Sequence, residues 1–93
     1  MRLYARGGQL LVAAADADLI GRTLREGKVQ LHVGDFYDGD VVAEGDLVAQ
    51  VQNSTMGNFV GEETVAACVR HGLIEEDGVI RVEGVPHAQL YLV

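Results

Sequence analysis

The densest group of basic residues lies in residues 21–28, GRTLREGK, which hold three of the seven basic residues of the chain. Arg22, Arg25 and Lys28 recur at three-residue spacing, and guanidinium forks bind phosphate or carboxylate groups through paired hydrogen bonds. A P-loop is excluded, because the Gly-Lys-Ser/Thr ending that it requires is missing. We interpret the segment as a loop leading into a strand. Its basic residues either contact an anion or RNA, or form ordinary ion pairs with Glu26 and nearby aspartates.

A second candidate is His87, which directly follows Pro86, the one proline of the chain. Proline fixes its own φ and biases Val85 toward extended geometry, so we expect a stiff bend over residues 84–87 that holds the histidine in place. Histidine serves as acid, base or ligand near neutral pH, but catalysis needs a nucleophile or an orienting carboxylate beside it. No spacing in the sequence selects such a partner. A structural hydrogen bond, ligand binding and general-base catalysis all stay open for His87.

Residues 35–46 form an acidic segment without a basic residue, and two adjacent aromatic residues, Phe36 and Tyr37, lie inside it. The acids do not follow the spacing of a calcium-binding loop, so we interpret the segment as a solvated acidic loop. Adjacent side chains in such a turn point in opposite directions. We therefore expect one aromatic ring to anchor the loop to the core and the other to be exposed for stacking.

The remaining ligand types do not favour a metal centre. One cysteine, Cys68, excludes a multi-cysteine site. A zinc site built from His32, His71 and His87 would need three distant segments to meet. The sequence therefore predicts neither a metal nor another cofactor.

The composition bounds the kind of protein that must position these residues. The 93 residues suffice for one domain, residues 1–93, since two cores would each fall below the size that usually folds unaided. A hydrophobic content of 48% with 23% charged residues is typical of a globular chain. No apolar run approaches the roughly 20 residues of a membrane span, and the first residues do not resemble a signal peptide. With a single cysteine, we expect a cytoplasmic protein that does not bind a membrane.

The net charge of −7 has two interpretations. It argues against a protein that grips nucleic acid by bulk electrostatics, because phosphate neutralisation supplies most of that affinity. In a salt-rich cytosol, however, excess surface carboxylates keep proteins soluble, and the net charge then reports the habitat more than the partner.

Hydrophobic periodicity and turn residues predict the elements that carry these candidates. Residues 2–6 and 9–15 indicate a β-hairpin, and Asp16 is expected to cap a short helical turn over residues 17–20. The further elements are a strand over 28–33, a helix from Glu44, a helix from Met56 or Asn58 to His71, and strands over 79–83 and 88–93. Gly57 and Gly61 are unusual inside a helix, so either that helix begins later or something approaches its backbone. The order predicts an α+β fold, a mostly antiparallel sheet with one or two helices packed on one face.

Several stretches taken together resemble an archaeal family, the domain of unknown function 424. They are REGK, FY-x-G, N-x-VGE and VPHAQ, and the resemblance covers nearly the whole chain in order. It implies a small single-domain cytoplasmic protein of archaea and favours an association with RNA or translation. It carries no activity, cofactor or catalytic residue over to this sequence.

We interpret the chain as a non-catalytic binding module for RNA or a ribonucleoprotein partner. The expected site consists of Arg22, Arg25, Lys28, Tyr37, His87 and Gln89. The arginines would hold a phosphate while Tyr37 or His87 stacks on an unpaired base. This site requires that folding bring the arginine segment and the proline-bearing corner to one surface.

Two alternatives come from other functional classes. A small enzyme would use His87 as general base on an anionic substrate held by Arg22 and Arg25. A homodimer would form through Phe36, Tyr37 and an edge strand at residues 90–93.

Overall fold

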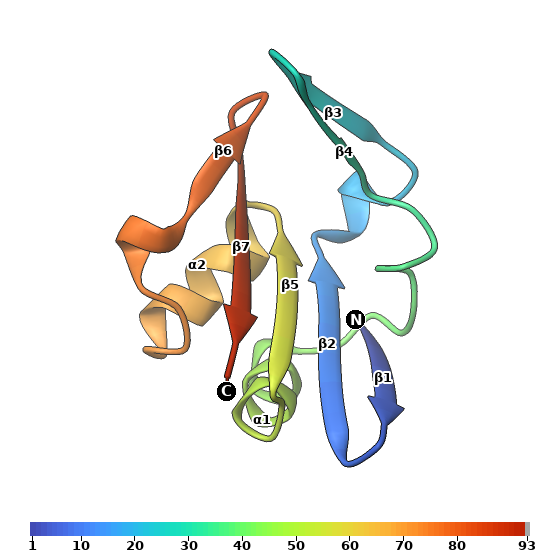
Figure 1. Cartoon of the computed structure of the whole chain (residues 1–93), viewed down its shortest axis with the longest axis vertical. Coiled ribbons are helices and arrows are strands. Elements are labelled where there is room, and N and C mark those ends of the chain that lie inside the picture. The colour runs from blue at the N-terminus through green and yellow to red at the C-terminus, as the bar shows by residue number, and fades with distance from the viewer. Residues whose placement is uncertain (93) are drawn as a thin grey trace.

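A five-stranded mixed sheet forms the centre of the protein, whose computed structural model describes residues 1–92 (Figure 1). In spatial order its strands are β1 (Arg2–Arg6), β2 (Gln9–Ala15), β5 (Met56–Val60), β7 (Val85–Tyr91) and β6 (Ile80–Val82). Neighbouring strands are antiparallel except for the parallel pair β2 and β5. A separate antiparallel hairpin consists of β3 (Thr23–Glu26) and β4 (Val29–His32). The predicted α+β fold with a mostly antiparallel sheet is confirmed.

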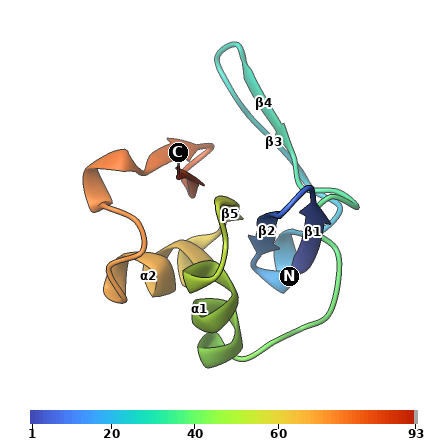
Figure 2. The ribbon, with the colours of Figure 1, turned by 60° about the horizontal axis from the view of Figure 1, so that its bottom comes forward.

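Two helices cover one face of this sheet, as predicted (Figure 2). They are α1 (Glu44–Gln52) and α2 (Glu62–Arg70), and two short 3-10 turns, η1 (Ala17–Leu19) and η2 (Glu76–Gly78), complete the elements. A parallel strand pair needs a crossover connection, and here the chain passes through the β3–β4 hairpin, the acidic loop and α1 between β2 and β5. Among residues 1–92, no helix has the length and apolar character needed to cross a membrane.

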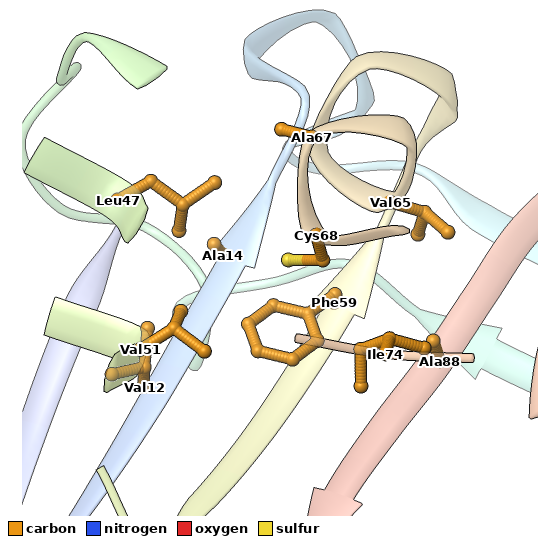
Figure 3. Close-up of a cluster of buried hydrophobic side chains, with 10 residues drawn as sticks. All are labelled: Val12, Ala14, Leu47, Val51, Phe59, Val65, Ala67, Cys68, Ile74 and Ala88. Atoms are coloured by element: carbon orange, nitrogen blue, oxygen red, sulfur yellow. The ribbon is translucent and has the colours of Figure 1, made fainter. Parts of the chain in front are cut away.

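Phe59 is the largest side chain of the core between the sheet and the helices. Figure 3 shows its ring between the side chains of Val51 and Ile74, beneath Cys68 of α2. The ring lies back over Gly57, where a Cβ atom would come within 2.3 Å of the ring carbon Cζ. The glycine is therefore required because the ring occupies the space of a side chain.

A smaller cluster lies on the opposite face of the sheet, beneath the base of the hairpin. Its buried members are Ala13, Leu19, Leu24, Val33, Tyr37, Val60 and Val82. It covers the end of the sheet nearest the hairpin, whereas at the far end of this face Tyr91 is 71% exposed. One face of the sheet is thus closed by helices and the other is only partly covered.

The long helix expected from Met56 or Asn58 to His71 is wrong at its start, because residues 56–60 form β5 and α2 begins at Glu62. Gly61 separates the two elements with a φ of 117°, a conformation that ends both strand and helix geometry and favours glycine. The first of the two explanations for the glycines, a later helix start, is therefore correct at Gly61. Close approach of a side chain explains Gly57.

Asp16 caps a different helix from the one expected. Its side chain makes no capping bond to the short turn η1. Instead its carboxylate accepts hydrogen bonds from the backbone N–H of Glu63 at 3.2 Å and from the N–H and hydroxyl of Thr64 at 2.9 and 2.8 Å. The residue that follows β2 thereby satisfies two N-terminal backbone donors of α2, a helix that begins forty-six positions later in the chain.

Two expected irregular segments are strands. Residues 23–26 form β3 rather than a loop, because Gly21 and Gly27, both with positive φ, make turns at its two ends. The expected bend over residues 84–87 is confined to the turn before β7, and His87 lies inside that strand. The chain tolerates Pro86 there because its missing N–H would point past the last residue of β5, while its carbonyl accepts the N–H of Gly61 at 2.9 Å. The expected last strand is β7, and its last position, residue 93, lies outside the described residues.

Replacing the capping carboxylate tests this arrangement. We expect Asp16→Ala to lower the free energy of unfolding by about 1–3 kcal/mol, because three donors at the start of α2 lose their acceptor. Urea unfolding followed by circular dichroism measures the change. The matched control is Asp18→Ala, an exposed aspartate two positions away. Equal stability of the two variants would contradict the assigned cap.

Candidate binding surface

The β3–β4 hairpin carries the predicted basic residues on an exposed arm. Cross-strand pairs alternate along it, so Arg25 and Gln30 share the outer face while Leu24 and Leu31 share the inner, core-facing side. Arg22 precedes β3, and Lys28 lies in the turn between the strands. All three basic side chains belong to exposed residues. The hairpin therefore presents positive charge to solvent while its inner side fixes its position.

Glu83 connects this hairpin to the turn between β6 and β7. Its carboxylate accepts the backbone N–H of Arg25 at 3.3 Å and lies 3.9 Å from the guanidinium of Arg22. The N–H of Glu83 in turn donates to the carboxylate of Glu26 at 3.1 Å. The exposed ion pair itself contributes little stability. The arginine segment and the turn before Pro86 do lie on a common surface, as the predicted site requires.

His87 projects from β7 onto the sheet face that the helices do not cover. Its cross-strand neighbours are Val60, a member of the smaller cluster, and Ile80. The ring atom Nδ1 lies 3.0 Å from the carbonyl oxygen of Phe59. A carbonyl only accepts, so Nδ1 is assigned the proton, and in the neutral form of the ring Nε2 is then the acceptor. Within residues 1–92 no carboxylate or hydroxyl hydrogen-bonds to this ring, so the general-base hypothesis gains no orienting partner from the structure.

Two rows of side chains cross the rest of this face. One row is Tyr4, Leu11, Met56 and Tyr91, and the next is Arg2, Ala13, Asn58 and Gln89. Gln89 and Tyr91 are exposed, while Leu11, Met56 and Asn58 are half-buried. Tyr4 and Tyr91 were not among the predicted site residues. The alternation of the strands places both on this face, but only the strand order shows that they share one row.

The two adjacent aromatic residues of the acidic loop divide their roles as expected. Tyr37 anchors the loop: it is 3% exposed, and its hydroxyl donates to Oδ1 of Asn58 at 2.5 Å. Phe36 is 40% exposed and stacks on Tyr4, with ring centroids 5.0 Å apart. The stacking role expected of Tyr37 is therefore wrong, because its buried ring offers no face to a base. Phe36 presents the ring that this role needs.

A cavity of about 800 Å³ lies near the ends of β2 and α2, between them and the acidic loop. Its walls include the carboxylates of Asp16, Asp38, Asp40, Glu44, Glu62 and Glu63 and one basic residue, Arg70. Of the six predicted site residues, only Tyr37 lines it. Such a wall repels a phosphate group. The cavity is therefore unfavourable for an anionic ligand.

Charge is unevenly divided between the two sides of the sheet. Near the helices, Arg70 and His71 both pair with Glu44, and Arg81 pairs with Glu62 at 3.0 Å. The hydrogen bonds from His71 and Arg70 hold the pKa of Glu44 below its ordinary value. The other five basic residues, Arg2, Arg6, Arg22, Arg25 and Lys28, belong to β1 and to the hairpin with its preceding turn.

The three histidines lie in separate surroundings. His32 shares a hydrogen bond with the hydroxyl of Thr23 at 2.9 Å, His71 pairs with Glu44, and His87 bonds to a backbone carbonyl. In the described part of the chain, no group of three or more His, Cys, Asp or Glu residues is arranged to hold a metal ion.

The burial of Tyr37 predicts a loss of stability at alkaline pH. Desolvation raises the pKa of Tyr37 from 10.0 to about 12, so folding favours the protonated phenol. This contribution is complete below pH 10 and is lost as the pH rises from 10 toward 12. We expect the free energy of unfolding of the wild type to fall more steeply over this range than that of Tyr37→Phe. Urea titrations at several pH values measure both slopes, with the exposed Tyr91→Phe as control. Identical slopes for all three proteins would contradict the assignment.

Comparisons with known proteins support the fold and the family. A family model described as "Protein of unknown function (DUF424)" matches residues 4–93. The chain is similar to a crystal structure of an uncharacterized conserved protein from Methanopyrus kandleri, with a TM-score of 0.82 and 27% sequence identity. That match covers 99% of this chain and 89% of the other. No curated protein matches the chain.

Proposed function

This chain belongs to the family of unknown function DUF424, and we propose that it is a non-catalytic module that binds single-stranded RNA on the open face of its sheet. The observation that supports the proposal is that the exposed rings of Phe36 and Tyr91 lie along this face, with the arginines of β1 and the basic hairpin at its borders. The other sheet face is covered by the helices, and the cavity is lined mainly by acidic residues, so neither is as suitable for a phosphate chain.

Stacking is the first contribution that this face can make. Phe36 and Tyr91 expose 40% and 71% of their surface, and Tyr4 extends the ring of Phe36 as a stacked pair. Bases of any sequence stack on aromatic rings, and each such contact is worth about 1–3 kcal/mol. Stacking needs unpaired bases, so the geometry favours a single strand over a duplex.

Positive charge on both flanks is the second contribution. Arg2 and Arg6 lie on β1 at one edge of the sheet, and Arg22, Arg25 and Lys28 lie on the hairpin. Neighbouring acids moderate this charge, since Glu26 and Glu83 lie on the hairpin side. We therefore expect moderate affinity with a clear salt dependence. The overall charge of −7 does not oppose such binding, because part of the excess acid surrounds the cavity and the helices.

Polar groups between the flanks can read the edge of a base. The half-buried His87 keeps Nε2 as an acceptor, and Gln89 on the same strand face offers both a donor and an acceptor. The side-chain amide of Asn58 keeps its N–H donors because Tyr37 occupies only its oxygen. Three of the predicted residues, His87, Gln89 and Arg25, thus keep binding roles in the proposal. Arg22 and Lys28 contribute charge.

Removal of one arginine tests the proposal. The change is Arg25→Ala, measured by fluorescence anisotropy with a labelled single-stranded RNA of about ten nucleotides over a series of salt concentrations. We expect weaker binding, and the slope of log affinity against log salt should decrease by about 0.7 for one lost phosphate contact. The matched control is Arg81→Ala, which removes an arginine paired with Glu62 on the helix side and should leave the slope unchanged.

Two results would contradict the proposal. One is the absence of binding to single-stranded RNA by the wild-type protein at low salt. The other is an affinity that does not depend on salt, or that Arg25→Ala and Arg81→Ala change equally. A duplex of the same sequence serves as competitor, and it should compete poorly because its bases are not available for stacking.

A further inference from the structure

β6 covers only the first part of the neighbouring edge of β7. Its three residues pair with Val85, Pro86 and His87. Within residues 1–92, no strand pairs with Ala88–Tyr91 on that side, although β5 pairs with them on the other. Figure 1 shows β7 continuing well beyond the part that runs beside β6.

The backbone of this uncovered part has hydrogen-bonding groups that point away from the sheet. The N–H of Gly61 donates to the carbonyl of Pro86, and the N–H of Leu92 donates to the carbonyl of Thr55. Backbone groups alternate in direction along an antiparallel strand, so the even-numbered residues of β7 face β5. Gln89 and Tyr91 therefore direct their N–H and C=O groups to the free edge. An extended strand is the partner that satisfies such groups.

The side chains of this edge strand do not repel a second copy of the same strand, because none of them carries a permanent charge. The strand Val85–Tyr91 contains neither an acidic nor a permanently basic residue, although the chain as a whole carries a charge of −7. The opposite edge of the sheet, β1, carries Arg2 and Arg6, and edge charges of this kind discourage pairing with another strand. Exposed apolar side chains flank the free edge: Ile80, Tyr91 and Leu92 are 55%, 71% and 56% exposed.

We propose that a second copy of this chain pairs with the free edge of β7, strand against antiparallel strand. Ile80 occupies the position beside His87, so the partner strand is confined to the edge from Ala88 onward. In an antiparallel pairing of residues 88–92 with their copy, the two-fold axis lies at Leu90, and the outward N–H and C=O groups of Gln89 in each copy pair with those of Tyr91 in the other. Two copies of an uncharged strand approach each other without repulsion. A charged partner is less suitable, because this strand has no acidic or permanently basic residue to pair with it.

The pairing extends the sheet across both copies. A two-fold axis that relates antiparallel neighbours in one sheet is perpendicular to it, so the open faces of the two copies lie on the same side. The dimer proposal depends on the edge of β7 alone and does not require that the face bind RNA. Of the dimer contacts predicted from the sequence, this dimer uses the last strand but not Phe36. Phe36 packs beside Tyr4 of β1, and β2 and β5 separate β1 from β7 in the sheet.

Sedimentation velocity from about 5 to about 500 µM protein tests the pairing, a range suited to a small interface. We expect a concentration-dependent dimer whose dissociation constant rises about tenfold or more in Tyr91→Lys, because each copy then brings a charged lysine into the pairing and the two lysines lie diagonally across it. The matched control is Gln9→Lys, an exposed residue at the β1–β2 turn, which should dimerise like the wild type. A second variant, Gln89→Pro, removes an outward N–H without removing a bond to β5.

Amide hydrogen exchange identifies the surface used. In the dimer, exchange at Gln89 and Tyr91 should slow as the protein concentration rises, while the amides of Ala88 and Leu90, which face β5, are protected throughout. A wild type that is monomeric over the whole range would overturn the inference. So would dimerisation unaffected by Tyr91→Lys and Gln89→Pro, or a dimer in which Gln89 and Tyr91 still exchange rapidly.

Discussion

The rest of the structure depends on the parallel pairing of β2 with β5 and on Asp16, which follows β2 and bonds to the end of β5. The N–H of Asp16 donates to the carbonyl of Val60 at 3.0 Å, which extends the strand pair by one residue. The carboxylate of the same residue binds the first turn of α2. One aspartate thus fixes where β5 ends and where α2 begins. Because both helices then lie over Phe59, the other face of the sheet is covered in part, by η1 with Leu19, the base of the hairpin and the loop at Tyr37.

Under the proposed function, this asymmetry would let a strongly acidic chain bind an anion on one side. Two of the seven basic residues, Arg70 and Arg81, are paired with glutamates on the helix side. The remaining basic residues flank the sheet face that carries the exposed rings. A net charge summed over the chain hides this division, since Coulomb interactions at a surface are screened within about 10 Å at moderate salt. The local charge therefore matters more for a ligand lying on the sheet than the total does.

Local patterns in the sequence predicted the parts of the fold that local interactions determine. The β1–β2 hairpin follows from alternation and from Gly7-Gly8, and the start of α1 at Glu44 was also predicted. The predicted start of α2 was wrong because the helix start is fixed by a contact with Asp16, which is distant in the sequence. Gly57 is explained by the ring of Phe59 folding back over it. Gly61 is explained by its φ of 117° at the boundary of α2 and by the carboxylate of Asp16, which would lie 2.3 Å from a Cβ atom there. Neither contact has a signature in the residues beside the glycine.

The candidate site shows the same limit. The meeting of the arginine segment with the β6–β7 turn was expected, but the residue that joins them, Glu83, has no motif. The phenol of Tyr37 was assigned to a ligand and instead bonds to Asn58 in the interior. Tyr4 and Tyr91 were missed because their shared row depends on the strand order β1-β2-β5-β7, which long-range pairing determines. Residue type indicated which side chains could bind, and topology decided which of them share a surface.

Mapping of amide chemical shifts by NMR during titration with single-stranded RNA tests the central claim most directly. The claim is that the uncovered sheet face is the binding surface. It predicts that the largest shift changes occur at Arg25, His87, Gln89 and Tyr91, while the amides of α1 and α2 move little. Changes concentrated around the acidic cavity and the helices, or no changes at low salt, would contradict it.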